Sequence, residues 1–235
     1  VRLVDVSDPA TPVETGHVTL VGPAHAVAAQ DGIALVALPK AVVVVDTTDR
    51  SAPREVARLP FAHYVGDVAL AGRLALVASS DEHVWTDGGP DVYAVDLADP
   101  RRPVAAGEVA LYGYSEALVA SGSSALVAQH IDGNLLRDTP GPPVTCEPGP
   151  CTPTPEATLP ADQGRLAVVD VRDPARLAQT DEITIGAPID ALAVRGARAY
   201  AAGDRDYEHG EKLTAIDLAP DGRASARWTT YADRY

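Results

Sequence analysis

Short apolar stretches that end in an aspartate recur along the chain and predict strands joined by tight turns. The first reads Leu-Val-Asp-Val-Ser-Asp-Pro-Ala-Thr-Pro-Val at residues 3–13. Proline presets the backbone of such a turn, and the aspartate side chain accepts hydrogen bonds from N–H groups two residues further on. We therefore interpret the repeated aspartates as structural residues that hold a turn in each copy. They are Asp5, Asp46, Asp96, Asp170 and Asp217.

A second pattern alternates with the first and consists of two apolar strands around a glycine. The glycines are Gly32, Gly72, Gly122 and Gly196. Successive aspartates of the first pattern lie 41, 50, 74 and 47 residues apart, and successive glycines lie 40, 50 and 74 apart. Because the two intervals lengthen together, each unit is one module with insertions between fixed parts. A period slightly above 40 residues with four strands per unit is typical of a propeller blade.

The sequence therefore predicts an all-β chain, a β-propeller of four-stranded blades with about four and a half blades present. No window shows a sustained helical period, and short aliphatic residues dominate, with one Phe and no Met. We expect one domain over residues 1–235. Its units lie at about 1–20 (a half unit), 21–61, 62–110, 111–185 and 186–235.

The half unit raises the question of how the ring closes. It supplies the third and fourth strands of a blade, whereas the chain ends after another fourth strand. We expect a fragment or an open arc of a larger propeller, with a compact five-bladed closure as the alternative. An open arc exposes strand edges, so we also expect self-association through them.

The phrase at residues 3–13 resembles the LVIVD repeat of bacterial and archaeal surface proteins. The resemblance extends over nearly the whole chain outside residues 131–164. It implies a β-propeller, usually secreted or attached to the cell envelope, and it carries over no family-wide catalytic residues. The chain departs from the pattern in the second copy, where the proline is delayed to Pro53, and at residues 217–222, which contain Leu-Ala-Pro-Asp-Gly.

The net charge of the chain excludes some classes of binding partner. The net charge is −14, from 33 acidic and 19 basic residues, which argues against nucleic acid and anionic membranes. No run of 18 apolar residues predicts a membrane span. Because the chain begins at Val1, we expect a removed leader or a piece of a longer chain.

One long insertion, at about residues 131–164, is rich in proline and glycine and predicts an extended surface loop. It holds the two cysteines, Cys146 and Cys151, on either side of a Pro-Gly-Pro turn. A local disulfide is our prediction, with two free thiols as the alternative. A metal clip is disfavoured because no second Cys/His pair lies nearby. A disulfide places the protein in an oxidising compartment, secreted or at the cell envelope.

Candidate binding residues gather in two kinds of segment. In a propeller, the loops between second and third strands share one face with the connections between blades, and loops on a rigid scaffold usually carry binding function. Their aromatic, acidic and amide side chains suit a protein, peptide or carbohydrate ligand. The candidates are His25, His63, Tyr64, Trp85, Tyr112, Tyr114, Glu116, His130, Asp190 and Tyr207.

Metal binding is a further hypothesis. Asp204, Asp206 and Glu208 offer oxygen ligands at alternating positions, suited to Ca²⁺ or another divalent cation, or else form a solvated acidic turn. Glu116 and Asp190 both stand six residues before a turn glycine and should begin innermost strands. There they could perform acid/base chemistry, bind a cation, or accept hydrogen bonds from strand N–H groups.

The function that this pattern favours is a secreted or envelope-associated binding module acting through one loop-rich face. Two alternatives remain open. One is a metal-dependent hydrolase or lyase with its centre at the channel mouth near His25, His63, Glu116 and Asp190, and the other is a non-catalytic scaffold segment. No nucleophile elbow, P-loop, dinucleotide fingerprint or zinc-protease motif occurs, so no catalytic residue is assigned.

Overall fold

The computed structural model describes residues 1–80, 91–111, 113–131, 163–185, 188–206, 210–219 and 223–232. These residues form one two-stranded sheet and four four-stranded sheets, all antiparallel. Within each four-stranded sheet the strands follow in chain order, so each sheet is one blade. We number the blades 1 to 5 along the chain, blade 1 being the half-blade.

The strands have the following bounds. Blade 1 contains β1 (Arg2–Asp5) and β2 (Val13–His17), and blade 2 contains β3 (Ala26–Gln30), β4 (Ile33–Leu38), β5 (Ala41–Asp46) and β6 (Arg54–Pro60). Blade 3 contains β7 (Tyr64–Ala71), β8 (Leu74–Ser80), β9 (Val92–Asp96) and β10 (Val104–Val109). Blade 4 contains β11 (Tyr114–Ser121), β12 (Ser124–Ile131), β13 (Gln163–Asp170) and β14 (Ala178–Thr184), with the short 3₁₀ helix η2 (Pro174–Arg176) between the last two. Blade 5 contains β15 (Ala191–Arg195), β16 (Arg198–Asp206), β17 (Gly210–Leu218) and β18 (Ala224–Ala232).

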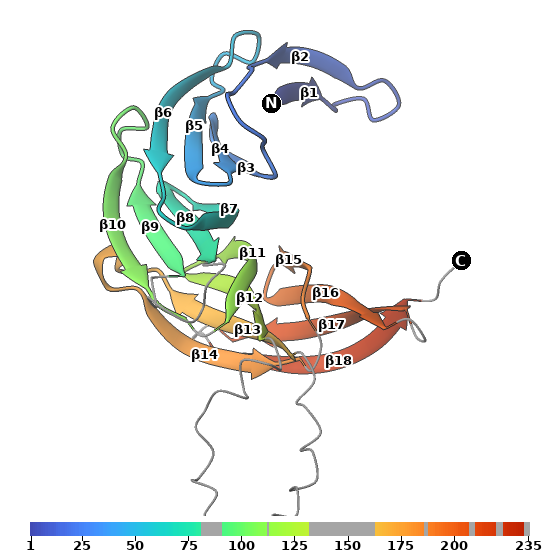
Figure 1. Ribbon diagram of the computed structural model, residues 1–235. Helices are drawn as coiled ribbons and strands as arrows, with labels where there is room; N and C mark the ends of the chain where they lie inside the picture. The colour runs from blue at the N-terminus through green and yellow to red at the C-terminus, as the bar shows by residue number, and fades with distance from the viewer. Residues whose placement is uncertain are drawn as a thin grey trace, which may run out of the picture.

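The blades follow one another around an open arc (Figure 1). The first strands β3, β7, β11 and β15 line its inside, and the fourth strands β6, β10, β14 and β18 form its outer rim. Blade 1 stands at one end and blade 5 at the other. The predicted β-propeller of four and a half four-stranded blades is confirmed. The described residues adopt the open arc rather than the five-bladed closure.

The antiparallel order gives the arc two faces. The first-to-second and third-to-fourth strand turns lie on one, which we call the turn face. The second-to-third strand loops and the connections between blades lie on the other, which we call the loop face. Two hydrogen bonds show the second grouping directly, because Pro39 O accepts from Val65 N at 3.0 Å and Lys40 O accepts from Phe61 N at 3.0 Å.

The repeated aspartates hold the turn face together as predicted. In four copies the strand-end carboxylate accepts the backbone N–H two residues on: Asp5 from Ser7, Asp46 from Thr48, Asp96 from Ala98, and Asp170 from Arg172. The aspartate three residues later repeats the motif: Asp8 accepts from Ala10, Asp49 from Ser51, Asp99 from Arg101, and Asp173 from Ala175. In the divergent fifth copy, Asp217 accepts from Arg198 and Arg227 side chains.

The core lies between blades rather than within one sheet. On β8, Ala75 and Val77 pack toward blade 2, whereas Leu76 and Ala78 pack toward blade 4. Middle strands covered on both faces read as continuous apolar runs instead of alternating ones. Blade 2 shows this most fully, since Val42–Val45 are all 0% exposed.

Two glycines in outer-edge strands leave room for the turn of the next blade to pack against the strand backbone. Gly16 on β2 faces the Arg50 carbonyl, and Gly107 on β10 faces the Pro174 carbonyl of η2. A Cβ at either position would meet that backbone oxygen inside van der Waals contact. At these two junctions the aspartate turn of one blade therefore packs directly on the backbone of the preceding blade.

The strand predictions hold, with differences at the insertions. β13 begins at Gln163, so the connection between β12 and β13 spans residues 132–162. Residues 204–206 were expected in a loop, but they extend β16, because Asp206 pairs with Gly210 and Arg205 with Glu211 in a hairpin with β17. Cys146 and Cys151 lie outside the described residues, so the predicted disulfide stays a prediction.

Candidate functional site

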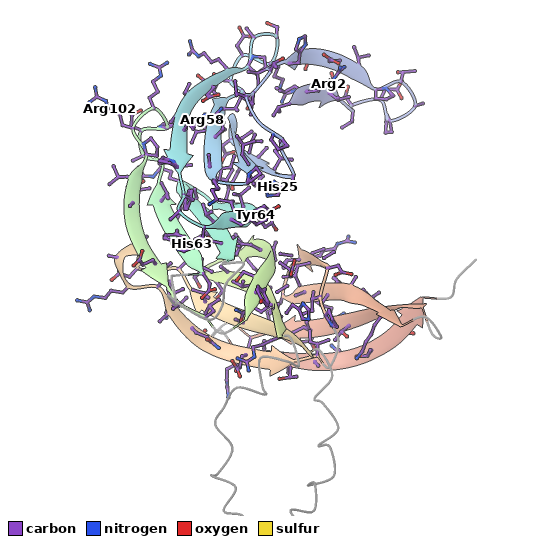
Figure 2. All side chains as sticks on the ribbon, in the orientation of Figure 1. Arg2, His25, Arg58, His63, Tyr64 and Arg102 are labelled. Atoms are coloured by element: carbon purple, nitrogen blue, oxygen red, sulfur yellow. The ribbon has the colours of Figure 1, made fainter. Side chains whose placement is uncertain are left out.

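A histidine and a tyrosine from neighbouring blades stack on the loop face (Figure 2). His25 directly precedes β3 and Tyr64 begins β7. Their ring centroids are 5.3 Å apart with an interplanar angle of 16°. The His25 Nε2 lies 2.6 Å from Val65 O, and because a carbonyl only accepts, Nε2 carries the proton. The predicted candidates His25 and Tyr64 therefore form one contact that joins blades 2 and 3.

Asp67 on β7 joins blades 3 and 4. Its Oδ2 accepts from Leu118 N on β11 at 2.8 Å, and its Oδ1 accepts from Val68 N at 2.8 Å. Burial raises the pKa of this carboxyl, while the two N–H groups and the nearby His25 ring partly oppose that shift. Asp67 was not among the predicted site residues.

Asp91 closes the loop-face end of blade 3. Its backbone O accepts from Ser79 N, its N donates to Val109 O, and its Oδ2 accepts from Leu111 N at 2.5 Å. Burial raises the pKa of Asp91 to about 6, against the opposing effects of the Leu111 N–H and His63. The predicted candidate His63 thus lies within electrostatic reach of this carboxyl.

Blade 4 carries a row of polar side chains near its loop-face end. Tyr114 and His130 are cross-strand neighbours with ring centroids 6.3 Å apart. Next to them Ser115 pairs with Gln129, and Gln129 pairs with Arg165 on β13. Arg165 also forms an ion pair with Glu182 at 3.0 Å. Polar side chains therefore cross blade 4 from its first to its fourth strand.

Glu116 and Asp190 occupy equivalent positions, as the sequence predicted. Glu116 forms the bulge before Ala117, which pairs with Ala128, and Asp190 precedes Ala191, which pairs with Ala202. Both side chains are exposed. They lie on separate blades, each at the start of an inner strand. Acid/base chemistry or cation binding by these carboxylates stays a prediction.

Several predicted residues fall outside what the structure describes. Trp85, Tyr112, Tyr207 and Glu208 are among them, as are the side chains of Asp204 and Asp206. Among the residues that the structure does describe, no group of three or more His, Cys, Asp or Glu side chains could hold a metal ion. No helix in this described part is long and apolar enough to cross a membrane.

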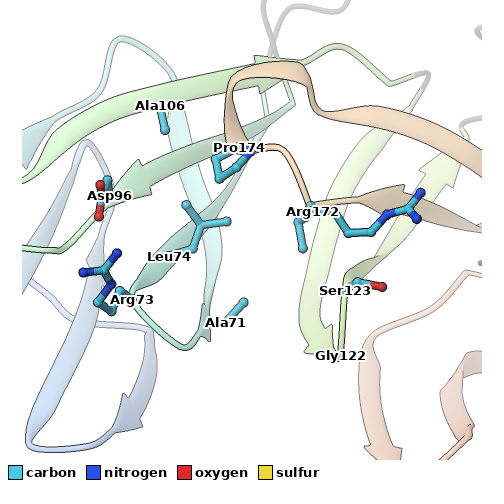
Figure 3. Close-up of a pocket in the computed structure, with 10 residues that line it drawn as sticks. Ala71, Arg73, Leu74, Asp96, Ala106, Gly122, Ser123, Arg172 and Pro174 are labelled. Carbon is cyan, nitrogen blue, oxygen red and sulfur yellow. The ribbon is translucent and has the colours of Figure 1, made fainter.

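A groove on the turn face was not predicted (Figure 3). It has a volume of about 370 Å³ and lies where the 72–73 hairpin turn, the 122–123 hairpin turn and η2 meet. Arg73 and Arg172 line it, and Arg172 is held by the carboxylate of Asp170. The groove forms from segments about 50 and 100 residues apart in the sequence, so no local pattern could have marked it.

Comparison with models of protein families finds a match to the LVIVD repeat at residues 2–19. The matched LVIVD segment is blade 1, with β1, the double aspartate turn and β2. Its turn hydrogen bonds recur in blades 2, 3 and 4, so the same aspartate turn is repeated around the arc. Comparison with curated protein sequences finds no match.

The chain is similar in fold to several solved structures. A protein from Lactobacillus plantarum aligns with a TM-score of 0.58 and 11% identity over 97% of this chain and 61% of that chain. Apo AztD from Citrobacter koseri aligns with a TM-score of 0.52 and 13% identity over 94% and 50%. The computationally designed Ika4 protein aligns at 0.48 and 11% over 91% and 93%. At these identities the first two likenesses support the fold alone, and this chain spans only 61% and 50% of their lengths.

Proposed function

We propose that this LVIVD-repeat propeller is a binding module whose ligand contacts the loop face at blades 2 to 4. The observation that carries the proposal is the His25–Tyr64 stack, held in place by the bond from His25 to Val65 O. An aromatic ring fixed by a neighbouring blade presents a preorganised surface, and preorganisation reduces the entropy lost on binding.

The strand ends that flank the two longest connections of the chain also lie on this face. Residues 81–91 join β8 to β9, and residues 132–162 join β12 to β13. These two connections leave adjacent blades on the side that carries Tyr64, Tyr114 and His130. Insertions on a rigid scaffold are the usual place for recognition. Ligands with hydroxyl or amide groups match this mixture of half-buried aromatic rings and hydrogen-bonding groups.

A binding screen with face-specific variants tests the proposal. The purified chain would be applied to glycan and peptide arrays, and each hit compared with Tyr64→Ala, Tyr114→Ala and the turn-face control Arg172→Ala. We expect both tyrosine variants to weaken binding at least tenfold, with Arg172→Ala unchanged. Hits that are lost in Arg172→Ala and kept in both tyrosine variants would refute a loop-face site.

The metal-dependent hydrolase or lyase gains no specific support, because the Nε2 of His25 is already engaged by the Val65 carbonyl. We further propose that the protein works outside the cytoplasm, as a Cys146–Cys151 disulfide would require. Alkylation of the native protein followed by mass spectrometry would test this. Two alkylated thiols in protein taken from its native compartment would contradict the proposal.

A further inference from the structure

A polar pair is enclosed at the junction of blades 3 and 4, directly below the loop face. Ser115 on β11 and Gln129 on β12 lie opposite each other and are 2% and 1% exposed. The Ser115 hydroxyl and both polar atoms of the Gln129 amide are buried, and none of them has a hydrogen-bond partner in the part of the chain that the structure describes. Buried polar atoms in folded proteins nearly always have a partner, so three at one place require an explanation.

The pair faces blade 3. Side chains alternate along a strand, and Ala125 and Val127 of β12 pack in one core cluster with Leu76 and Ala78 of blade 3. Gln129 follows Val127 by two residues and therefore points to the same side. The backbones are close there, since a Cβ on Gly66 would lie 2.8 Å from Ser115 O. The space beside the pair is consequently small.

In the other four-stranded blades, the residue equivalent to Gln129 leaves no side-chain polar group without a hydrogen-bond partner. Blade 2 has Leu38, which is 4% exposed. Blade 3 has Ser79, whose hydroxyl donates to Tyr64 O at 3.1 Å. Blade 5 has Gly203, where a Cβ would collide with the Pro188 carbonyl. The position of Ser115 is taken in blade 3 by Val65, which is 0% exposed. The fold therefore does not require polar residues here, and the pair is particular to blade 4.

The chemistry of the three atoms identifies their partner. The Gln129 Nε2 donates, its Oε1 accepts, and the Ser115 hydroxyl does both. A metal cation would satisfy the oxygens and leave Nε2 unpaired, and Arg165 pairs with Gln129 in the sheet and disfavours a second positive charge. An anion would satisfy Nε2 and leave Oε1 unpaired. Only a neutral molecule that both donates and accepts serves all three atoms.

We propose that Ser115 and Gln129 form an internal hydration site, where ordered water bridges the serine hydroxyl to the glutamine amide between blades 3 and 4. Buried waters in proteins typically make about three hydrogen bonds to polar groups that lack other partners. The site lies next to Tyr114 and His130, so it fixes the polar layer beneath the loop face. It does not depend on whether that face binds a ligand.

The repeat itself supplies the test variants. Gln129→Leu and Ser115→Val install the residues that blades 2 and 3 carry at the equivalent positions, so both fit the fold. Oxygen-17 relaxation dispersion counts long-lived internal waters, and urea unfolding reports stability on the same samples. We expect each variant to lose at least one long-lived water and to unfold at lower urea. The control Ser79→Ala removes a direct hydrogen bond and should lower the urea midpoint with the long-lived water count unchanged.

If no water lies between Ser115 and Gln129, the variants should give the opposite result. If Gln129→Leu raises the urea midpoint and leaves the water count of the parent protein unchanged, the amide has no bound water and the proposal is wrong. Should both variants fail to fold, a high-resolution crystal structure of the parent protein decides. Density for water between Ser115 Oγ and the Gln129 amide supports the site, and continuous side-chain packing without such density overturns it.

Discussion

Because an aspartate turn packs directly on the backbone of the preceding blade at Gly107, the substitution Gly107→Ala should strongly reduce the stability of the fold. A Cβ at Gly107 would lie 2.1 Å from Pro174 O and 3.2 Å from Ala175 Cα. Both partners are backbone, Gly107 is paired with Ala94 in the sheet, and the turn is fixed by Asp173, which accepts from Ala175 N at 3.1 Å. No flexible side chain can move aside, so η2 must withdraw from blade 3.

The magnitude follows from two opposing contributions. Overpacking of a tight contact costs about 1–3 kcal/mol, and the upper value applies because the backbone itself must shift. Replacing glycine by alanine within a strand regains about 0.5–1 kcal/mol of conformational entropy. The net expectation is a loss of about 2 kcal/mol, which corresponds to a fall in Tm of about 4–8 °C for a chain of this size.

Thermal and urea unfolding followed by far-UV circular dichroism would measure this loss. Glu108→Ala, an exposed neighbour on the same strand, is the matched control and should change stability by less than about 0.5 kcal/mol. Gly16→Ala should repeat the loss, because its Cβ would meet the Arg50 carbonyl. A Gly107→Ala protein as stable as the parent would show that the turn is not seated on blade 3.

Three further predictions concern carboxylates. The pKa of Asp91 is raised from 3.8 to about 6, so the folded state holds the proton more tightly and the stability of the fold falls as pH rises from about 4 to about 6. Asp91→Asn keeps an acceptor for Leu111 N and should be about 1 kcal/mol more stable than the parent at pH 7.5, after allowance for solvent screening of this partly buried group. At pH 4 the two proteins should be equally stable, and urea unfolding at both pH values would measure the difference. The pKa of Asp46 is lowered to about 2, chiefly by the Thr48 hydroxyl, so its contribution to folding stability is complete above pH 3.8 and is lost as pH falls toward 2. Asp46→Asn should therefore make stability less dependent on pH in this acid range, and an unchanged pH dependence would argue against the turn hydrogen bonds. Asp67→Ala removes the acceptor of Leu118 N and should destabilise the chain by about 2 kcal/mol, with faster hydrogen exchange at that amide than in the parent; unchanged exchange there would contradict the inter-blade bond.

The repeat made the architecture predictable. The paired spacing of strand aspartates and turn glycines located the blades, since each turn depends on residues only two or three positions apart. The end of β16 was not predicted: the strand runs on to Asp206 because residues 210–212 pair with it. The sequence alone offered no means of choosing between loop and hairpin there.

The site was predictable only in outline. The sequence placed His25 and Tyr64 on one face, and in the structure their rings stack. Their role in binding stays a prediction. Asp67 and Gln129 were missed because their partners or neighbours belong to another blade, 51 residues away in the case of Asp67 and Leu118. A signal existed for Gln129, an amide that ends the otherwise apolar run Ala125–Ala128. Which polar residue in a strand is buried depends on the packing between blades.

Hydrogen exchange of the chain at low concentration, read by mass spectrometry, tests the open arc most directly. Blade 1 is a two-stranded sheet at the end of the arc, and isolated two-stranded sheets are marginally stable, whereas blade 2 has four strands and a core at 0–4% exposure. We predict that peptides from residues 1–20 exchange fully while those from residues 33–46 remain protected. Equal and slow exchange in both segments would mean that blade 1 is completed by further strands and that the arc is closed.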